Sequence, residues 1–371
     1  MFIRREPLQE ISRALLSAVD TTNNTELAGT LELLVDNHVL LLAVTNSEYM
    51  VSTKIDVTSE GSLQATVDAN LFLKLILKMT KEAIDITVDG NSLKISGDGT
   101  YSLPMLFDGD KLRSLPRINL KNRQVEFDVN TSILKSILQF NSKELSKGAA
   151  VSPVQYMYYV DEKGCITFTT SACVNEFELP APMKLLLPAK LVRLFRLFTD
   201  DTVNLKYGVD TLDDGMEQRK IMLSDSSIII QSYLPVSDDL IDSVPAEAIR
   251  GRAYGDYPYD VKMNKQALNG ALDRMLLFAS PTVSSVSRCC FTNEGMTIYS
   301  PDGGNRELIP FITSHDEFTE PYETALDLTD LAATVQGCPE SVVKISFGDT
   351  TAFVFTSGAI RTVIPECQLE N

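Results

Sequence analysis

Two stretches of the chain place basic side chains at helical spacing without an acidic residue among them. They span residues 71–81, LFLKLILKMTK, and 187–198, LPAKLVRLFRLF. Because successive residues of an α-helix turn by about 100°, the basic side chains of each stretch form a stripe opposite an apolar face. Rows of ammonium and guanidinium groups bind phosphate oxygens, so the predicted chemistry is the binding of a polyanion rather than catalysis. The six residues are Lys74, Lys78, Lys81, Lys190, Arg193 and Arg196.

The rest of the chain is acidic, with a formal net charge of −17 over 371 residues. Two other stretches with helical periodicity, 8–20 and 328–337, carry net negative charge. We therefore expect a positive surface that several helices share unevenly, while acidic strands and loops repel DNA elsewhere. The alternative is that each stripe is an ordinary solvated helix face. Three further basic side chains lie in other amphipathic stretches: Lys135, Lys265 and Arg274.

An acidic segment, VDTLDDGMEQ at 209–218, offers an alternative function, because clustered carboxylates can bind a divalent metal in a nuclease. Its spacing fails the calcium-loop pattern, since Leu212 takes the third position and Ile221 the twelfth, where that loop needs oxygen ligands. Its place between two predicted strands favours a solvated hairpin loop. The acidic residues are Asp210, Asp213, Asp214 and Glu217.

A second alternative is a single-strand DNA-binding repeat protein, in which aromatic rings stack on bases beside basic side chains. Both kinds of side chain occur in 250–259. That segment lies within 243–260, where proline, glycine and charge interrupt the periodicity, so we favour a linker. The residues concerned are Arg250, Arg252, Tyr254, Tyr257 and Tyr259.

Cysteine and histidine offer little for catalysis or metal binding. The chain has two histidines, and its six cysteines form no Cys-x-x-Cys pair and have no histidine at ligand spacing. We expect reduced, mostly buried thiols, no metal and no cofactor. There is no signal-peptide core and no apolar run of about 20 residues, which predicts a cytoplasmic protein that does not span a membrane.

One structural plan recurs three times along the sequence. Leu71, Leu191 and Leu331 each open an apolar helical stretch that leads into an alternating strand. A second set of amphipathic helical stretches interleaves with the first, and each member precedes two strands joined by a polar turn, as in antiparallel hairpins. The second set comprises 8–20, 131–143 and 265–278. The pattern predicts an α+β protein of three repeated domains of roughly 120 residues, each with two helices and antiparallel sheets. The predicted domains are 1–122, 123–245 and 246–371.

In these features the chain resembles the bacterial DNA polymerase III beta sliding clamp family. The resemblance runs essentially end to end, and its most similar segments are 66–106, 185–208 and 363–371. It implies three DNA-clamp domains with inner helices and outer antiparallel sheets, forming half of a closed ring that a second copy completes head to tail. The implied partners are double-stranded DNA of any sequence, a DNA polymerase and a separate ATP-dependent clamp loader.

The resemblance also implies a hydrophobic pocket for a partner's peptide. The family builds it from a Thr-Asp-Gly-His-Arg-Leu stretch, a proline at the end of the second domain and a C-terminal Met-Pro segment. Residues 170–175 here read TSACVN, so the Asp-Gly-His-Arg chemistry is lost and the peptide motif is expected to differ. This departure indicates a divergent branch, with viral or plasmid-borne clamps among its candidate sources. The alternative is that Ile364 and Pro365 only finish an edge strand. The implied pocket residues are Thr170, Ala172, Val174, Val244, Pro245, Ile364, Pro365 and Leu369.

Overall fold

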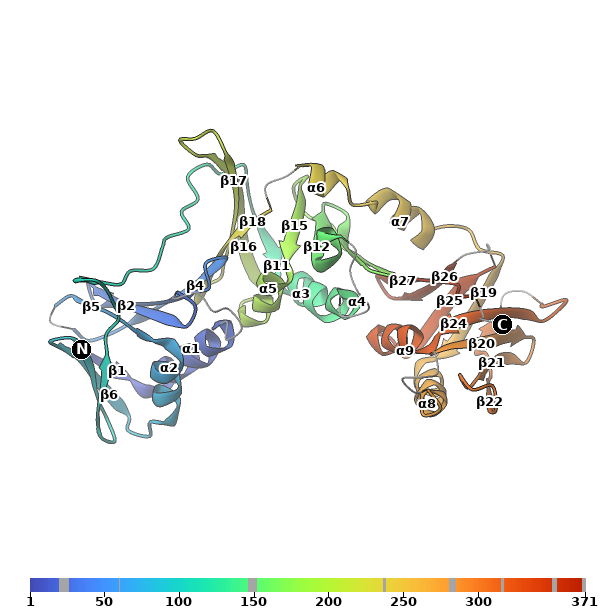
Figure 1. The fold of residues 1–371 in the computed structure, drawn as a ribbon, viewed down its shortest axis with the longest axis horizontal. Helices are drawn as coiled ribbons and strands as arrows, with labels where there is room; N and C mark the ends of the chain where they lie inside the picture. Colours follow the sequence, from blue (N-terminus) through green and yellow to red (C-terminus); the bar gives the residue numbers. More distant parts are fainter. Residues whose placement is uncertain are drawn as a thin grey trace. The chain divides into compact units, whose positions relative to one another are not determined.

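The computed structural model describes residues 1–19, 27–59, 61–145, 152–235, 238–279, 285–314, 317–348 and 352–368. The chain divides into two compact units, coloured along the sequence in Figure 1. Unit 1 comprises Met1–Ser132 with Arg193–Val236, and unit 2 comprises Ile133–Val192 with Ser237–Asn371.

Unit 1 is built on an eight-stranded antiparallel sheet. Strand β18 shows why it forms: buried residues alternate with half-buried ones along IIIQSYL, as the two faces of a pleated strand require. The pairing of β18 with β4 joins segments far apart in the sequence. The strands in order across the sheet are β11 (Val125–Asn130), β16 (Thr202–Thr211), β17 (Glu217–Ser224), β18 (Ile228–Leu234), β4 (Tyr49–Asp56), β3 (Val39–Thr45), β2 (Thr30–Asp36) and β5 (Leu63–Asp68).

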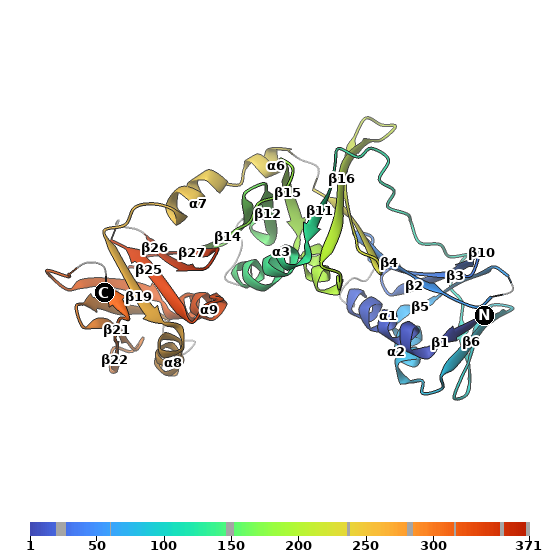
Figure 2. The ribbon, with the colours of Figure 1, turned by 180° about the vertical axis from the view of Figure 1, so that it is seen from behind.

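Among its described residues, unit 1 also has a second sheet, a short strand pair and three helical segments. Helices α1 and α2 pack side by side, as both Figure 1 and Figure 2 show, and they contact strands of the large sheet. The helical segments are α1 (Arg5–Ala18), α2 (Ala69–Lys78) and the 3₁₀-helix η3 (Arg193–Leu197). The second sheet has the order β1 (Phe2–Arg4), β6 (Ala83–Asp89), β7 (Ser92–Ser96) and β8 (Thr100–Pro104), and a short pair comprises β9 (Phe107–Asp108) and β10 (Lys111–Leu112).

Unit 2 contains a nine-stranded sheet and a four-stranded sheet. In the larger one β14 pairs with β27, again joining distant parts of the sequence. Its order is β15 (Lys184–Pro188), β12 (Met157–Asp161), β13 (Gly164–Phe168), β14 (Ala172–Glu176), β27 (Ile360–Pro365), β26 (Ala352–Ser357), β25 (Val342–Phe347), β19 (Tyr259–Asn264) and β23 (Thr313–Ser314). The smaller sheet has the order β22 (Arg306–Ile309), β21 (Gly295–Tyr299), β20 (Val286–Thr292) and β24 (Tyr322–Asp327).

The helical segments of unit 2 vary in length and type. One helical stretch begins in α3 (Thr131–Ser136), widens into a π-helix, η1 (Ile137–Asn141), and ends in α4 (Ser142–Leu145). Helix α8 packs against α9, and α9 contacts α4. The remaining segments are η2 (Pro153–Tyr156), α5 (Ala189–Val192), α6 (Asp238–Asp242), α7 (Ala246–Ala253), α8 (Lys265–Leu276) and α9 (Leu328–Gly337).

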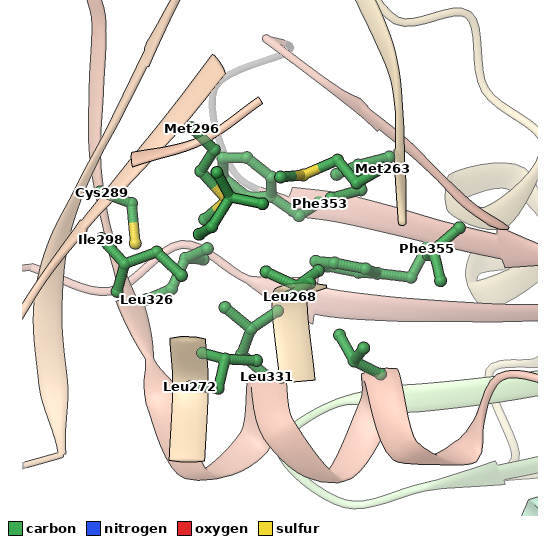
Figure 3. Close-up of a cluster of buried hydrophobic side chains, with 14 of the residues drawn as sticks. Met263, Leu268, Leu272, Cys289, Met296, Ile298, Leu326, Leu331, Phe353 and Phe355 are labelled. Carbon is green, nitrogen blue, oxygen red and sulfur yellow. The ribbon is translucent and has the colours of Figure 1, made fainter. Parts of the chain in front are cut away.

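One core of unit 2 lies between the helix pair α8–α9 and the sheets (Figure 3). Leu268 and Leu272 are one helical turn apart on α8, and Leu331 meets them from α9. Phe353 and Phe355, two residues apart on β26, reach the same core. All five are almost completely buried, and each contributes about 1.5–3 kcal/mol by leaving water. The amphipathic periodicity of these segments therefore decides which helix face lies inward.

The element order repeats three times, as the sequence predicted. Each third reads strand, helix, four strands, helix, three strands: β1 to β8, β11 to β18 and β19 to β27, apart from short additional segments. The three predicted hairpins are also confirmed, as β2–β3, β12–β13 and β20–β21. The segment 243–260, predicted to be a linker, contains helix α7. In the part of the chain that the structure describes, no helix is both long and apolar enough to cross a membrane.

Candidate nucleic-acid interface

Helix α2 presents two of the predicted cations on its exposed face. Lys74 and Lys78 are exposed, whereas Phe72, Leu73 and Ile76 on the other face are buried. Neither lysine has an acidic partner among the described residues. The predicted stripe is thus confirmed for these two positions.

The helix ends earlier than predicted, so Lys81 does not belong to it. Met79 has an extended backbone, with φ −72° and ψ 143°. The carboxylate of Asp98, in the β7–β8 turn, accepts hydrogen bonds from the backbone amides of Thr80 and Lys81, which stops the helical hydrogen-bond pattern. Lys81 is nevertheless exposed and follows the same end of α2.

The predicted helix over 190–198 is an α-helical turn followed by a 3₁₀-helix. In the 3₁₀ part, residues three apart eclipse each other, so Arg193 and Arg196 share one side while Phe195 and Phe198 are buried together. Arg196 is exposed, and its Nη2 donates to the carbonyl of Ser17 at 3.1 Å, next to the end of α1. Arg193 is half-buried.

The unit boundary falls within this predicted stripe. Lys190 lies in α5 of unit 2, where it is half-buried and interacts with other groups. The stripe predicted over 187–198 is therefore divided between the two units, with Lys190 in unit 2 and Arg193 and Arg196 in unit 1.

The cations of unit 2 differ in how available they are. Lys135 on α3 is exposed. The ammonium of Lys265 instead donates to the carbonyls of Gln336, at 3.2 Å, and Cys338, at the end of α9, where the helix dipole favours a cation. Arg274 makes two hydrogen bonds to the carboxylate of Glu307, one of them from Nε at 2.9 Å. Lys265 and Arg274 are thus already engaged within the protein.

The hydrogen bond between Arg274 and Glu307 shifts the pKa of both side chains. The hydrogen bond between the side chains raises the pKa of Arg274 and lowers that of Glu307. Both groups therefore stay ionised, and their charges largely cancel at this surface.

Two basic residues near these helices were missed. Arg13 is exposed on α1 and has no acidic partner within the described residues, but the net negative charge of 8–20 concealed it. Lys143 on α4 is half-buried and lies beside Gly337 at the end of α9. Burial, and then the neighbouring charge of Lys265, lowers its pKa. Counting charges residue by residue would have found Arg13, whereas the contact of Lys143 is tertiary.

The acidic segment is a hairpin, as the sequence favoured. Strands β16 and β17 pair from Asn204↔Ser224 to Thr211↔Glu217. Asp210 is buried and accepts a hydrogen bond from Lys220 at 2.8 Å, which lowers its pKa. It also accepts from the backbone amide of Asn122 at 3.0 Å. Across the described ranges there is no group of three or more metal-ligating side chains.

The aromatic residues of 250–259 do not form a common stacking surface. The ring of Tyr259 stacks on Phe318 at 4.9 Å and belongs to the core. The hydroxyl of Tyr257 donates to the carbonyl of Arg252 at 2.7 Å. Tyr254 lies under Arg361, whose guanidinium carbon is 4.2 Å from the ring centre. These contacts therefore do not support the alternative of a single-strand DNA-binding surface, which needed the aromatic rings to lie together.

The implied pocket residues separate into two hydrophobic clusters. Val174 and Val244 belong to one, against which Val363 packs, whereas Ile364 is buried in the other, which also contains Leu268 and Leu331. Strand β27 lies between β14 and β26, but β14 pairs only with Ile360–Val363, so Ile364 and Pro365 end the strand with β26 as their one described neighbour. Ala172 is buried, and Leu369 lies outside the described residues. The exposed members are Thr170, Pro245 and Pro365.

A hollow of about 240 Å³ touches only part of this set. Val244 and Pro245 line it, together with Tyr159 and Asp161 of β12. Among the described residues, the other members of the implied pocket do not line this hollow.

Comparison with solved structures gives full-length similarities. The chain superposes on the DNA polymerase III subunit beta of Pseudomonas aeruginosa with a TM-score of 0.83 and 15% identity, covering 100% of both chains. The TM-scores are 0.80 for the DNA polymerase III beta subunit of Thermotoga maritima, at 14% identity, and 0.78 for the sliding clamp of Bacillus subtilis, at 16%. Each comparison covers 100% of this chain and 99% of the other.

This chain has the sliding-clamp fold. The resemblance read from the sequence is therefore confirmed at the level of the fold, at identities of only 14–16%. Comparison with models of protein families and with curated protein sequences gave no match.

Proposed function

We propose that this protein is a DNA sliding clamp, a non-catalytic processivity factor that encircles duplex DNA and tethers a DNA polymerase. The observation that carries the proposal is the clamp fold over the whole length of the chain, at a TM-score of 0.83. A ring acts by topology, so it needs a surface that tolerates DNA of any sequence and no catalytic group. Loading would come from a separate ATP-dependent protein.

The DNA-facing surface in this proposal consists of the exposed cations on or beside the helices. Lysine and arginine on long side chains contact phosphates at any register, which permits sliding because phosphates carry no sequence information. Lys190 and Arg193 are half-buried and have a smaller role. Lys265 and Arg274 position helix α9 and strand β22 through the contacts described above, rather than contacting DNA strongly. The main set is Arg13, Lys74, Lys78, Lys81, Lys135 and Arg196.

Two sheet edges support a ring made of two copies. Strand β8 is at the edge of one four-stranded sheet, and β22 is at the edge of the other. Each has unpaired backbone groups, and large apolar side chains near them are exposed: Tyr101 by 39%, Leu308 by 46% and Leu277 by 79%. Addition of β8 of one copy to β22 of the next would satisfy these groups and bury the apolar side chains. Within this ring each chain contributes the domains 1–122, 123–245 and 246–371.

The proposal is tested by the topology of DNA binding. Protein incubated with nicked circular plasmid, an ATP-dependent clamp loader and ATP is separated by gel filtration at about 150 mM salt, which screens charge contacts beyond about 8 Å. A clamp co-elutes with the circle and is lost when a restriction enzyme linearises the same DNA. Equal retention on the circle and on the linear product would refute the ring.

A further inference from the structure

A hollow of about 490 Å³ lies beside strand β6 in unit 1, and we call it the β6 hollow. Its lining includes Ser59, Leu63 at the start of β5, and Val88 near the end of β6. Val88 is 41% exposed, although it lies on the same face of β6 as the buried Ile84 and Ile86. The hollow therefore opens onto the part of this sheet face that the protein leaves uncovered.

The internal repeat shows which residues stand at the same place in the third repeat, β19 to β27. Strands β6 and β25 each begin five residues after the preceding helix ends, so Val88 corresponds to Phe347. Strands β5 and β24 each end at an aspartate five residues after they begin, so Leu63 corresponds to Tyr322. The ring centres of Phe347 and Tyr322 are 5.1 Å apart. The first repeat, β1 to β8, therefore has two aliphatic side chains where the third has two packed rings.

Two more rings complete the cluster of the third repeat. Tyr259 of β19 lies opposite Phe347 in the antiparallel pairing, and their ring centres are 5.5 Å apart. Tyr259 also stacks on Phe318, which stands four residues before β24. The residue four positions before β5 is Ser59. Aromatic rings thus fill in the third repeat the space that is hollow in the first.

The backbone of β6 has a free edge beside the hollow. Strand β1 pairs with β6 only over residues 83–85, and the amide of Ile86 donates to the carbonyl of Met1 at 2.9 Å. Because hydrogen-bonding positions alternate along an antiparallel strand, the N–H and C=O groups of Val88 point to the same side as those of Ile86. Among the described residues, no strand pairs with Val88 on that side. This is the side on which β19 pairs with β25 in the third repeat.

The charge beside the ring differs between the two repeats. Asp260 directly follows Tyr259, and the ammonium of Lys344 on β25 lies 2.9 Å from its carboxylate. The position of Lys344 on β25 corresponds to that of Asp85 on β6. Like charges on neighbouring strands repel, so an acidic residue after the ring would be disfavoured in the first repeat. A segment that fits there carries a neutral or basic residue after its aromatic residue.

We propose that the β6 hollow is a binding site for an aromatic side chain on an extended segment of a partner protein. The segment adds to the free edge of β6 beside Val88, as Tyr259 of β19 does beside Phe347. Addition of a strand supplies main-chain hydrogen bonds, while the hollow accepts the ring and gives specificity. The site does not rest on the DNA function proposed above.

The probe is the acetylated and amidated tripeptide Pro-Tyr-Lys, which keeps the order Pro258-Tyr259 and has lysine in place of Asp260. It is titrated into the full chain, isotope-labelled at the methyl groups of isoleucine, leucine and valine, without DNA. The ring current of the tyrosine should shift the methyl signals of Val88 and Leu63, with a dissociation constant on the order of 1 mM. The tripeptide Pro-Ala-Lys should cause no such shift. Pro-Tyr-Asp should bind about threefold more weakly than Pro-Tyr-Lys.

Val88→Phe gives the first repeat the ring that the third has at this position. It fills the hollow, so binding of Pro-Tyr-Lys, followed at Leu63, should weaken by about tenfold or more. Leu71→Phe is the matched control, because it adds a ring at another exposed aliphatic position of unit 1, and it should keep the wild-type affinity.

Four results would overturn the proposal: no shift with Pro-Tyr-Lys, an equal shift with Pro-Ala-Lys, unchanged affinity in Val88→Phe, or an equal loss in Leu71→Phe. Equal affinity for Pro-Tyr-Asp would overturn the requirement for a residue that is not acidic. If p-cresol, the free ring of tyrosine, bound as tightly as the tripeptide, the ligand would be a small aromatic molecule and the assignment to a protein segment would be wrong. Since no DNA is present, these results leave the test on circular and linear DNA unaffected.

Discussion

Replacing Lys74 and Lys78 by alanine should reduce the salt dependence of DNA binding while leaving the fold intact. Both side chains are exposed on α2 and have no acidic partner among the described residues. Alanine favours the helix at least as well as lysine, so stability should change little. The variant therefore isolates the electrostatic contribution of one helix.

The magnitude follows from counterion release. Each phosphate contact contributes about 0.9 to the slope of log K against log salt, so losing two contacts lowers the slope by about 1.8. Raising salt from about 50 to about 200 mM should then weaken wild-type binding about 12-fold more than it weakens the variant. If both chains of a ring contact the duplex together, the slope falls by about 3.6. The measurement is fluorescence anisotropy of a labelled duplex of about 30 base pairs over a salt series.

The matched control removes two exposed lysines of unit 1 that lie on strands. Lys54 is on β4 and Lys111 is on β10, and their replacement by alanine changes the net charge by the same amount. The control should keep the wild-type slope. An unchanged slope in the helix variant, or an equal fall in the control, would remove α2 from the DNA surface.

Three further outcomes are expected. Leu277→Asp places a charge on the most exposed apolar side chain near β22 and should convert two-chain rings into monomers, whereas a wild-type mass by light scattering would contradict this ring interface. Asp210→Asn should lower the free energy of unfolding at pH 7 by about 2 kcal/mol, because the buried Lys220 ammonium loses the negative charge of its hydrogen-bond acceptor. The pKa of Asp210 is lowered from 3.8 in the folded state. Its contribution to stability is therefore full above the unfolded-state pKa and is lost as the pH falls through the folded-state pKa. In urea titrations between pH 5 and 2, the variant should lose less stability than the wild type. Burial raises the pKa of Cys338 to about 11. At pH 8, iodoacetamide should therefore modify this thiol about 100-fold more slowly than an ordinary thiol, and urea should remove the difference by unfolding the chain. Equal rates in the folded chain would show that the thiol is accessible.

Periodicity allowed much of this fold to be predicted from local sequence. The amphipathic stretch 328–337 coincides with α9, because the apolar residues of a surface helix recur with its turn. The hairpin at Asp161 was equally local, since its polar turn joins strands that are neighbours in the chain. The repeated order of elements followed from the same signals, whereas the clamp fold was indicated by the resemblance of segments 66–106, 185–208 and 363–371 to the sliding clamp family.

The sequence determined which side chains are cationic and which helices carry them, since charge and helical spacing are local properties. Only the tertiary structure decided which cations are available to bind DNA. Glu307, which neutralises Arg274, is distant from it in sequence, and so are the carbonyls that accept hydrogen bonds from Lys265. The same holds for α7, whose helical form depends on packing against strands β14 and β27. Contacts between remote segments leave no periodic trace in the sequence, and for that reason they appear only when the chain is folded.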